Sequence, residues 1–241
     1  MAQRTAAASE IAPGGTLRAG AIGIRVMHGV AEPVGQFIAD RLGVTYEPVV
    51  YSDPRDYAQS FGKGEWDIAM GARVLAPTDS ADITPDVWLV DLLYLAAPGG
   101  DLTHIDQIDQ PGRKIGAVLN SPSDRYLTGT LKSAELVCIP LSSNFTDEAI
   151  ALLREGKIDA LGADFGFIDS MVEIFTEARI IPGAYTSVRV AAALPKGLSE
   201  AAFATLVETL NEAKEAGIVQ ESIDQAGLQN GVRVAPSNSD D

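Results

Sequence analysis

KIGAVLNSPSDRYLTGTLKSAELVCIPLSSNFTDEAIALLREGKIDALGAD, residues 114–164, is the stretch that decides the fold. Short apolar runs at 114–119, 136–140 and 159–163 alternate with two segments of helical periodicity, 123–133 and 146–155. Leu127 and Leu131 share one face of the first of these helices. The order strand, helix, strand, helix, strand predicts a right-handed parallel α/β unit.

The same order of elements occurs once before in the chain. Alternating or apolar runs at 16–21, 44–50 and 66–70 predict three strands. A helix is predicted at 32–42, where Gly43 offers a left-handed position for its end, and a helical turn at 53–62. The chain therefore contains two similar α/β halves, and no short repeat of the solenoid type is present.

Two extended apolar segments, 88–97 and 185–194, are long enough to connect the halves, and we expect them to form two hinge crossings. A helical pair at 199–216 and 218–228 is expected to return to the first half. The predicted lobe 1 is therefore discontinuous, 15–96 plus 186–231, and lobe 2 is 97–185. Small and polar residues at 1–14 and 232–241 predict flexible tails.

The composition excludes several classes of function. Of 241 residues, 46% are hydrophobic and 21% charged, and the net charge of −15 argues against nucleic acid or an anionic membrane surface as a partner. No apolar run approaches the roughly 20 residues of a membrane helix. The single cysteine, Cys138, lies in an apolar run and is expected to be a buried small hydrophobe. His28 and His104 have no zinc-site spacing, so we expect no metal, and no cofactor motif occurs.

Four passages together resemble one family. They are GTLRAG at 15–20, GKGEWD at 62–67, the segment 102–118 and GKIDALGAD at 156–164. In this order and spacing the chain resembles the type II solute-binding proteins of ABC transporters, of the amino-acid-binding, family 3-like kind. The resemblance implies an α/β, two-lobed periplasmic-binding-protein-like fold, in which each lobe is a mostly parallel sheet flanked by helices.

The resemblance also implies a function. A receptor of this kind captures a small polar or charged solute in a cleft between its lobes and delivers it to the membrane permease of the transporter. We therefore expect a monomer without cofactor or enzymatic activity, located in the periplasm or outside the cell. Met1 followed by small residues is consistent with a leader that has been replaced.

The first candidate ligand contacts lie in the turn after the strand at 114–119. The resemblance implies that such a turn holds an anionic part of the ligand, which makes Asn120, Ser121 and Ser123 candidates, together with helix N–H groups. Pro122 removes one of these N–H donors. Simple capping of the following helix explains the same residues, and the two interpretations do not exclude each other.

The second candidate group follows the strand at 159–163. Asp164 matches the position whose carboxylate, by the resemblance, binds a ligand amino group, and Phe165 follows it. A carboxylate at a strand end needs a cationic or hydrogen-bonding partner, because an unpaired buried charge is costly. The alternative is that Asp164 only caps the next segment.

The largest departure from the family pattern follows the strand at 66–70. The position of the arginine that clamps a ligand carboxylate falls at Asp79, so this clamp is missing. Arg73, with Gly71 and Ala72 beside it, is a candidate to supply the charge, and Arg25 after the first strand is another. Arg73 is alternatively a surface side chain. The ligand class therefore remains open among amino-acid derivatives, carboxylates, amines and polar osmolytes.

Two other functions compete with transport. A dehydratase-like lyase on the same fold needs a general acid beside an anion-binding arginine, for which Arg73 with Asp164 or Asp79 is the combination available. A ligand-sensing accessory domain is the third hypothesis. The sequence contains no Gly-x-Ser-x-Gly elbow and no P-loop.

Overall fold

The computed structural model describes residues 5–142 and 144–236, with the backbone but not the side chains of Ala72 and Val74. The described residues form two compact units. Unit 1 extends to Leu89 and resumes at Arg189, and unit 2 is Val90–Val188. Both divisions fall inside the segments expected to be crossings, within the long strands β4 (Ala81–Ala96) and β8 (Arg179–Pro195). They differ by a few residues from the predicted boundaries at 96/97 and 185/186.

Unit 1 is built on the parallel strands β1 (Thr16–Ile22), β2 (Thr45–Tyr51) and β3 (Ile68–Ala72), in the order β2-β1-β3. The later part of β8 pairs antiparallel with β3, and β9 (Val232–Val234) pairs with β4. The helices of this unit are α1 (Ala6–Ile11), α2 (Arg25–Leu42), α3 (Pro54–Ser60), α7 (Glu200–Glu215) and α8 (Ile218–Gln225).

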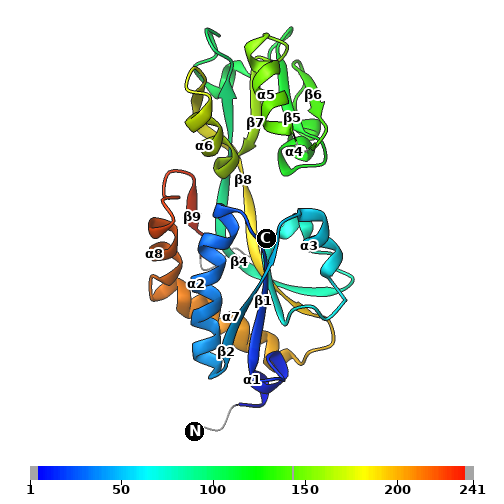
Figure 1. Cartoon of the computed structure of the whole chain (residues 1–241), viewed down its shortest axis with the longest axis vertical. Helices are drawn as coiled ribbons and strands as arrows, with labels where there is room; N and C mark the ends of the chain where they lie inside the picture. The colour runs from blue at the N-terminus through cyan, green and yellow to red at the C-terminus, as the bar shows by residue number, and fades with distance from the viewer. Residues whose placement is uncertain (1–4, 143, 237–241) are drawn as a thin grey trace. The chain divides into compact units, whose positions relative to one another are not determined.

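The predicted strands and helices of unit 1 are present, but α2 begins at Arg25 and not near residue 32. Val26, Val30, Val34 and Ile38 recur at helical spacing and are all buried. Gly43, with φ 67°, ends the helix in the left-handed conformation that its sequence position predicted. Figure 1 shows α2 and α3 on opposite sides of β1, so the sheet is covered on both faces.

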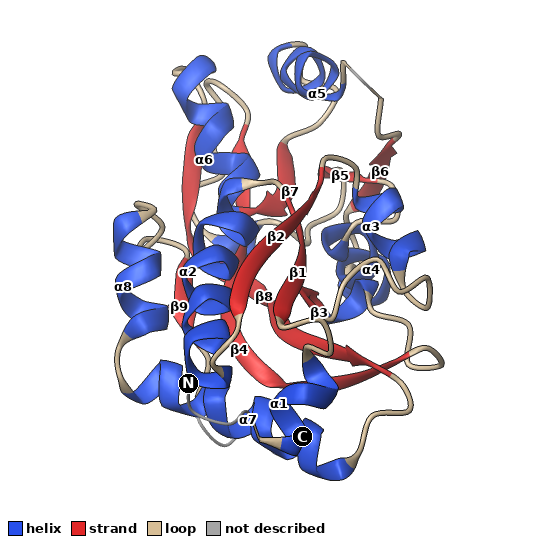
Figure 2. Ribbon diagram, turned by 60° about the horizontal axis from the view of Figure 1, so that its bottom comes forward, coloured by secondary structure: helices blue, strands red, loops and turns tan. Residues whose placement is uncertain are grey.

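Unit 2 repeats the pattern. The strands β5 (Lys114–Val118), β6 (Glu135–Ile139) and β7 (Ala160–Asp164) are parallel in the order β7-β5-β6, and β4 pairs antiparallel with β7. The helices α4 (Pro122–Thr130), α5 (Phe145–Arg154) and α6 (Phe165–Ile174) accompany them. In Figure 2 the strands are red and the helices blue. The prediction of an α/β fold with parallel strands flanked by helices in each unit is confirmed, but the described strands belong to one nine-stranded sheet and not to two separate sheets.

Three expectations about the chain's periphery were wrong. Residues 6–11, expected in a loose tail, form α1, whose Ile11 is buried and whose Glu10 carboxylate accepts hydrogen bonds from the Ser199 backbone and hydroxyl at the start of α7. Residues 232–234, also expected in a tail, form β9. Cys138 is exposed and not buried, because it lies on β6 at the edge of the sheet.

One further observation concerns membranes. Across residues 5–142 and 144–236, none of the helices combines the length and the apolar character that a bilayer crossing requires.

Candidate functional site

The turn after β5 is held by local hydrogen bonds. Asn120 has φ 64°, a left-handed conformation that non-glycine residues seldom adopt. Its backbone N–H donates to the carboxylate of Asp124 at 2.7 Å, and the Ser121 hydroxyl accepts from the Asp124 backbone N–H at 3.2 Å. Ser121 is thus the N-cap of α4, as the capping interpretation predicted. Whether Asn120 and Ser121 also contact a ligand stays a prediction.

Ser123 is buried beneath a group of aromatic rings. The Tyr185 hydroxyl donates a hydrogen bond of 2.7 Å to the Ser123 Oγ. The ring of Tyr185 stacks on Tyr94 with a centroid distance of 4.3 Å and lies 5.5 Å from the ring of Tyr126. Gly162 leaves room for this packing, since a Cβ there would lie 3.0 Å from the Tyr185 hydroxyl. Tyr94 is buried, whereas Tyr126 is 38% exposed and offers an aromatic surface to solvent.

Asp164 ends β7 beside these rings. Its carboxylate Oδ1 accepts from the Phe167 backbone N–H at 3.1 Å and so caps α6, as the alternative interpretation predicted. Burial raises the pKa of the Asp164 carboxyl, although backbone N–H groups of the helix start act in the opposite direction. Gly162, two residues before Asp164 on β7, lies against the Tyr185 hydroxyl, and alternate residues of a strand share one face. Burial raises the pKa of Tyr185, and the charge of Asp164 acts in the same direction.

No cationic side chain among residues 5–142 and 144–236 pairs with Asp164, which makes it a half-buried carboxylate without a counter-ion. Phe165, the next residue, is buried as the first residue of α6. Together Tyr94, Ser123, Tyr126, Asp164 and Tyr185 form what we call the tyrosine site. It lies at the carboxyl ends of β5 and β7, where open α/β sheets bind their ligands.

Sequence reasoning selected Ser123 and Asp164 of the tyrosine site but not the three tyrosines, and ligand contact of Ser123 and Asp164 stays a prediction. Tyr94 and Tyr185 lie within segments that had been interpreted only as apolar crossings, and Tyr126 lies on a helix. The chain has six tyrosines, and three of them contact one another at this site. Attention to this infrequent residue type is the signal that could have pointed to them.

In unit 1, Arg73 follows β3 directly. Its Nε and Nη2 donate to Asp86 Oδ1 at 3.1 and 2.9 Å, and Nη2 also donates to the Thr84 carbonyl at 2.8 Å. The Arg189 Nε donates to the other carboxylate oxygen of Asp86. Asp86 is only 2% exposed, so one buried carboxylate holds two guanidinium groups. We call Arg73 and Arg189 the arginine pair.

The remaining candidates of unit 1 have other positions. Gly71 packs against the buried ring of Tyr57, since a Cβ would lie 2.5 Å from the Tyr57 hydroxyl. Ala72 pairs through its backbone with Val190, and its side chain lies outside the described part of the chain. Arg25, expected in a loop, is an exposed residue in the first turn of α2. Their contact with a ligand is still untested.

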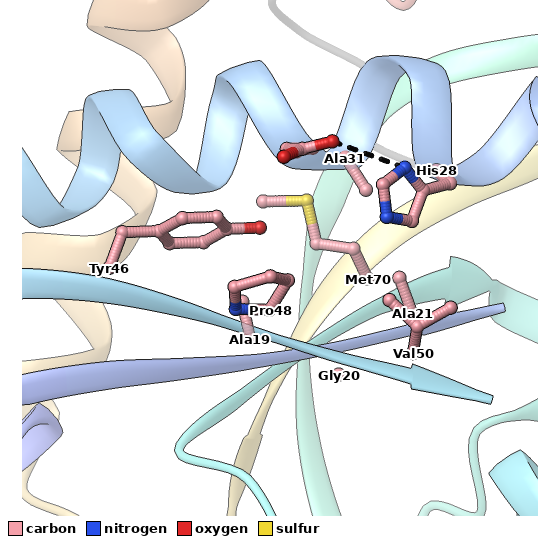
Figure 3. A pocket seen from close by; sticks show the side chains of 10 residues that line it. Ala19, Gly20, Ala21, His28, Ala31, Tyr46, Pro48, Val50 and Met70 are labelled. Atoms are coloured by element: carbon pink, nitrogen blue, oxygen red, sulfur yellow. Dashed lines mark ion pairs between the residues drawn. The ribbon is translucent and has the colours of Figure 1, made fainter. Parts of the chain in front are cut away.

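A small cavity lies between α2 and the strands β1 and β2 (Figure 3). Tyr46 and Met70 point into it, and His28, whose Nδ1 lies 3.3 Å from the Glu32 carboxylate, borders it. Burial, with a contribution from Glu32, raises the pKa of Tyr46 to about 12. The cavity volume of about 10 Å³ has room for about one water molecule, so this cavity is too small to hold a solute.

No protein-family model matches this sequence, and no curated protein matches it. Solved structures do resemble it. An arginine-binding protein from T. maritima has a TM-score of 0.64 at 17% identity, over 92% of this chain and 99% of that one. An amino acid ABC transporter substrate-binding protein from Streptococcus pneumoniae, bound to L-arginine, has a TM-score of 0.64 at 18% identity, over 90% and 96%.

A third similar structure is an ancestral amino-acid-binding protein, a precursor of cyclohexadienyl dehydratase. Its TM-score is 0.63 at 17% identity, over 90% of this chain and 98% of that one. The chain therefore has the α/β fold of the two-lobed periplasmic-binding proteins. At these identities the comparison shows a shared fold. This fold agrees with the resemblance to amino-acid-binding solute-binding proteins that the sequence analysis described.

Proposed function

We propose that this chain is a solute-binding receptor, which captures a small polar molecule bearing a cationic group at the tyrosine site. The observation that carries the proposal is the Asp164 carboxylate, which accepts backbone N–H groups at the start of α6 but has no cationic partner among residues 5–142 and 144–236. A carboxylate removed from water is costly unless a cation or several hydrogen bonds compensate it. A ligand ammonium or guanidinium group would supply that compensation.

The surrounding residues support the same proposal. The exposed ring of Tyr126 offers an aromatic face, and aromatic faces attract cations by roughly 0.5–2 kcal/mol. The hydroxyls of Ser123 and Tyr185 are joined in one hydrogen bond and retain acceptor capacity for a polar ligand group. The similar structures that bind L-arginine are consistent with a ligand of this charge.

A thermal-shift screen tests this proposal. The screen would compare cationic amino acids, simple amines, zwitterionic osmolytes and uncharged sugars. A true ligand at about 100 times its Kd adds about 2.7 kcal/mol of stability. We expect hits among cationic compounds that disappear in Asp164→Asn but persist in Asp53→Asn, a matched change at the N-cap of α3. Absence of any hit, or hits that Asp164→Asn retains, would argue against the tyrosine site.

The same proposal includes three further statements. The chain delivers its solute to the permease of an ABC transporter, it is a monomer, and it is located in the periplasm or outside the cell. They are supported by the fold shared with a transporter's substrate-binding protein. Deletion of the gene should abolish uptake of the solute found in the screen, and normal uptake in the deletion strain would contradict the transport role.

A lyase is the second candidate function, favoured by the structure of a dehydratase precursor and by Asp164 itself. Because burial raises the pKa of this carboxyl, Asp164 holds its proton more firmly than an exposed aspartate and suits the role of general acid. Incubation with a cyclohexadienyl substrate distinguishes the two functions. Formation of an aromatic product by the wild-type chain but not by Asp164→Asn would establish the lyase function. If the substrate stays unchanged, the lyase function is contradicted and the receptor function is the one that stands.

A further inference from the structure

A groove lies between the helices α2 and α8 of unit 1, which pack side by side (Figure 1). Most of its exposed lining is apolar and includes the half-buried side chains of Pro33, Phe37 and Ile218. Its volume is about 290 Å³. Pockets that enclose a small ligand measure about 300–1,000 Å³, so this open groove suits the side chains of a partner better than a whole solute.

Two carboxylates in the groove are held by neutral groups. Asp40 Oδ1 accepts a hydrogen bond of 2.8 Å from Gln36 Nε2, and Glu221 Oε1 accepts one of 2.9 Å from Gln225 Nε2. A glutamine amide donates hydrogen bonds but carries no charge. Neither carboxylate has a cationic partner among residues 5–142 and 144–236. Their negative charge is therefore available to a partner.

The charges around the groove do not compensate these carboxylates. The helix α8 contains the acidic residues Glu221 and Asp224 and no basic residue. Arg41, at the end of α2, is engaged elsewhere, because its Nε lies 3.2 Å from the Glu212 carboxylate and its guanidinium covers the Phe37 ring at 4.9 Å from the centroid. The groove therefore combines an apolar lining with an excess of negative charge.

We propose that this groove binds a protein partner through a basic amphipathic segment, whose apolar side chains contact Phe37 and Ile218 and whose lysine or arginine side chains bind Asp40 and Glu221. Helices lay an apolar face into grooves of this kind, and opposite charges at the rim select the partner. The chain's own net charge of −15 disfavours a second copy or an anionic lipid surface.

The inference goes beyond the proposed function and does not depend on it. The groove belongs to unit 1, whereas the residues of the tyrosine site belong to unit 2. The solute and the basic segment are therefore separate ligands, and each can be tested in the absence of the other.

A labelled peptide tests the groove with the full chain. The probe is a fluorescein-labelled helical peptide with leucine on one face and lysine on the other, measured by fluorescence anisotropy at physiological ionic strength. We expect saturable binding by the wild type, weakened about five- to tenfold when Asp40→Asn and Glu221→Gln are combined. Both changes keep an acceptor for the glutamine amides. Glu47→Gln combined with Asp56→Asn removes the same charge from exposed positions of β2 and α3, and should bind like the wild type.

Three results would overturn the proposal. The first is a wild-type chain that shows no saturable binding. The second is equal weakening in the two double variants, which would indicate general attraction to an acidic chain. The third is equal affinity for a peptide with serine in place of leucine, which would show that the apolar lining is not used.

Nuclear magnetic resonance locates the contact. The side-chain amide signals of Gln36 and Gln225 should shift when the peptide is added, because these amides donate to the two carboxylates. Peptide binding that leaves both signals unchanged would contradict the groove as the site. A solute that binds at the tyrosine site should bind the Asp40→Asn, Glu221→Gln chain as it binds the wild type, so failure of the groove is distinguishable from failure of the proposed function.

Discussion

At the scale of single residues, Asp164 combines a structural role with the proposed binding role. Its Oδ1 caps α6, while its charge has no counter-ion among the described side chains. Residues that serve binding in this way commonly lower the stability of the unliganded protein. Asparagine keeps an acceptor for the cap and removes the charge, so the two roles are separable by one substitution.

We expect Asp164→Asn to stabilise the unliganded chain by roughly 0.5–2 kcal/mol at pH 7. The folded-state pKa of Asp164 is raised above its unfolded value of about 3.9. The protonated carboxyl therefore favours folding below that value, and this contribution is lost as pH rises through the folded pKa. Urea unfolding of the wild-type and Asp164→Asn chains should be measured from pH 4 to pH 8. The free energy of unfolding of Asp164→Asn should exceed that of the wild type by an amount that grows with pH. A difference that does not change with pH would contradict a raised pKa of Asp164.

The same reasoning applies to ligand affinity. A cation beside Asp164 favours the ionised carboxylate, so binding releases a proton and affinity should increase as pH rises through the pKa of the free protein. Titrations of a cationic ligand in two buffers of different ionisation enthalpy would detect the proton release at a pH near that pKa. Affinity that falls over this range would contradict the role of Asp164.

Asp86→Asn tests the ion-pair cluster of Asp86 with Arg73 and Arg189. It leaves Arg73 and Arg189 opposed without their shared carboxylate, and removal of one partner from a buried ion pair costs about 3–5 kcal/mol. Because the arginines are about a third exposed, we expect a smaller loss of roughly 2 kcal/mol in urea unfolding. Asp82→Asn, whose carboxylate pairs with Lys196 at the surface, is the control and should cost little.

The sequence predicted part of the candidate site for a clear reason. Ser123 and Asp164 follow apolar strands, and the end of a parallel strand is where a sheet presents ligand-binding groups. Arg189 and Tyr185 lie inside a long apolar strand, where periodicity indicates only burial. Their positions depend on pairing with β3 and on packing against α4, which no local pattern reveals.

At the scale of elements, local signals predicted the strands and most helices well. Failures occurred where tertiary contacts decide. Residues 6–11 are too few for a stable isolated helix, and α1 forms because Ile11 is buried and Glu10 binds the start of α7. The start of α2 was placed too late, since Gly29 and Pro33 interrupt the pattern that its buried residues otherwise follow.

Gly71 gives a prediction at this scale, because β3 approaches α3 closely at that point. A Cβ at Gly71 would lie 2.5 Å from the hydroxyl of the buried Tyr57. Gly71→Ala should therefore destabilise the chain by roughly 1–3 kcal/mol, as overpacked cores do. Gly129→Ala, in α4 with nothing within 4 Å, should be neutral or slightly stabilising. Equal effects of the two substitutions in thermal unfolding would contradict the close packing of β3.

At the scale of the whole molecule, two α/β units share two long strands, β4 and β8, and each unit presents charged residues at the end of a parallel strand. The fold agrees with that of amino-acid-binding proteins despite identities below 20%. The order of strands and helices therefore predicted more of this molecule than any single motif did. Counted without gaps, the arginine position that the resemblance implies falls at Asp79, and Arg73 lies nearer the end of β3.

Calorimetric titration of the best compound from the solute screen is the most direct test of the central claim. The claim predicts one molecule bound per chain, binding lost in Asp164→Asn, and binding retained in Asp53→Asn. A compound that binds the Asp164→Asn chain with the affinity of the wild type would show that the solute is held elsewhere.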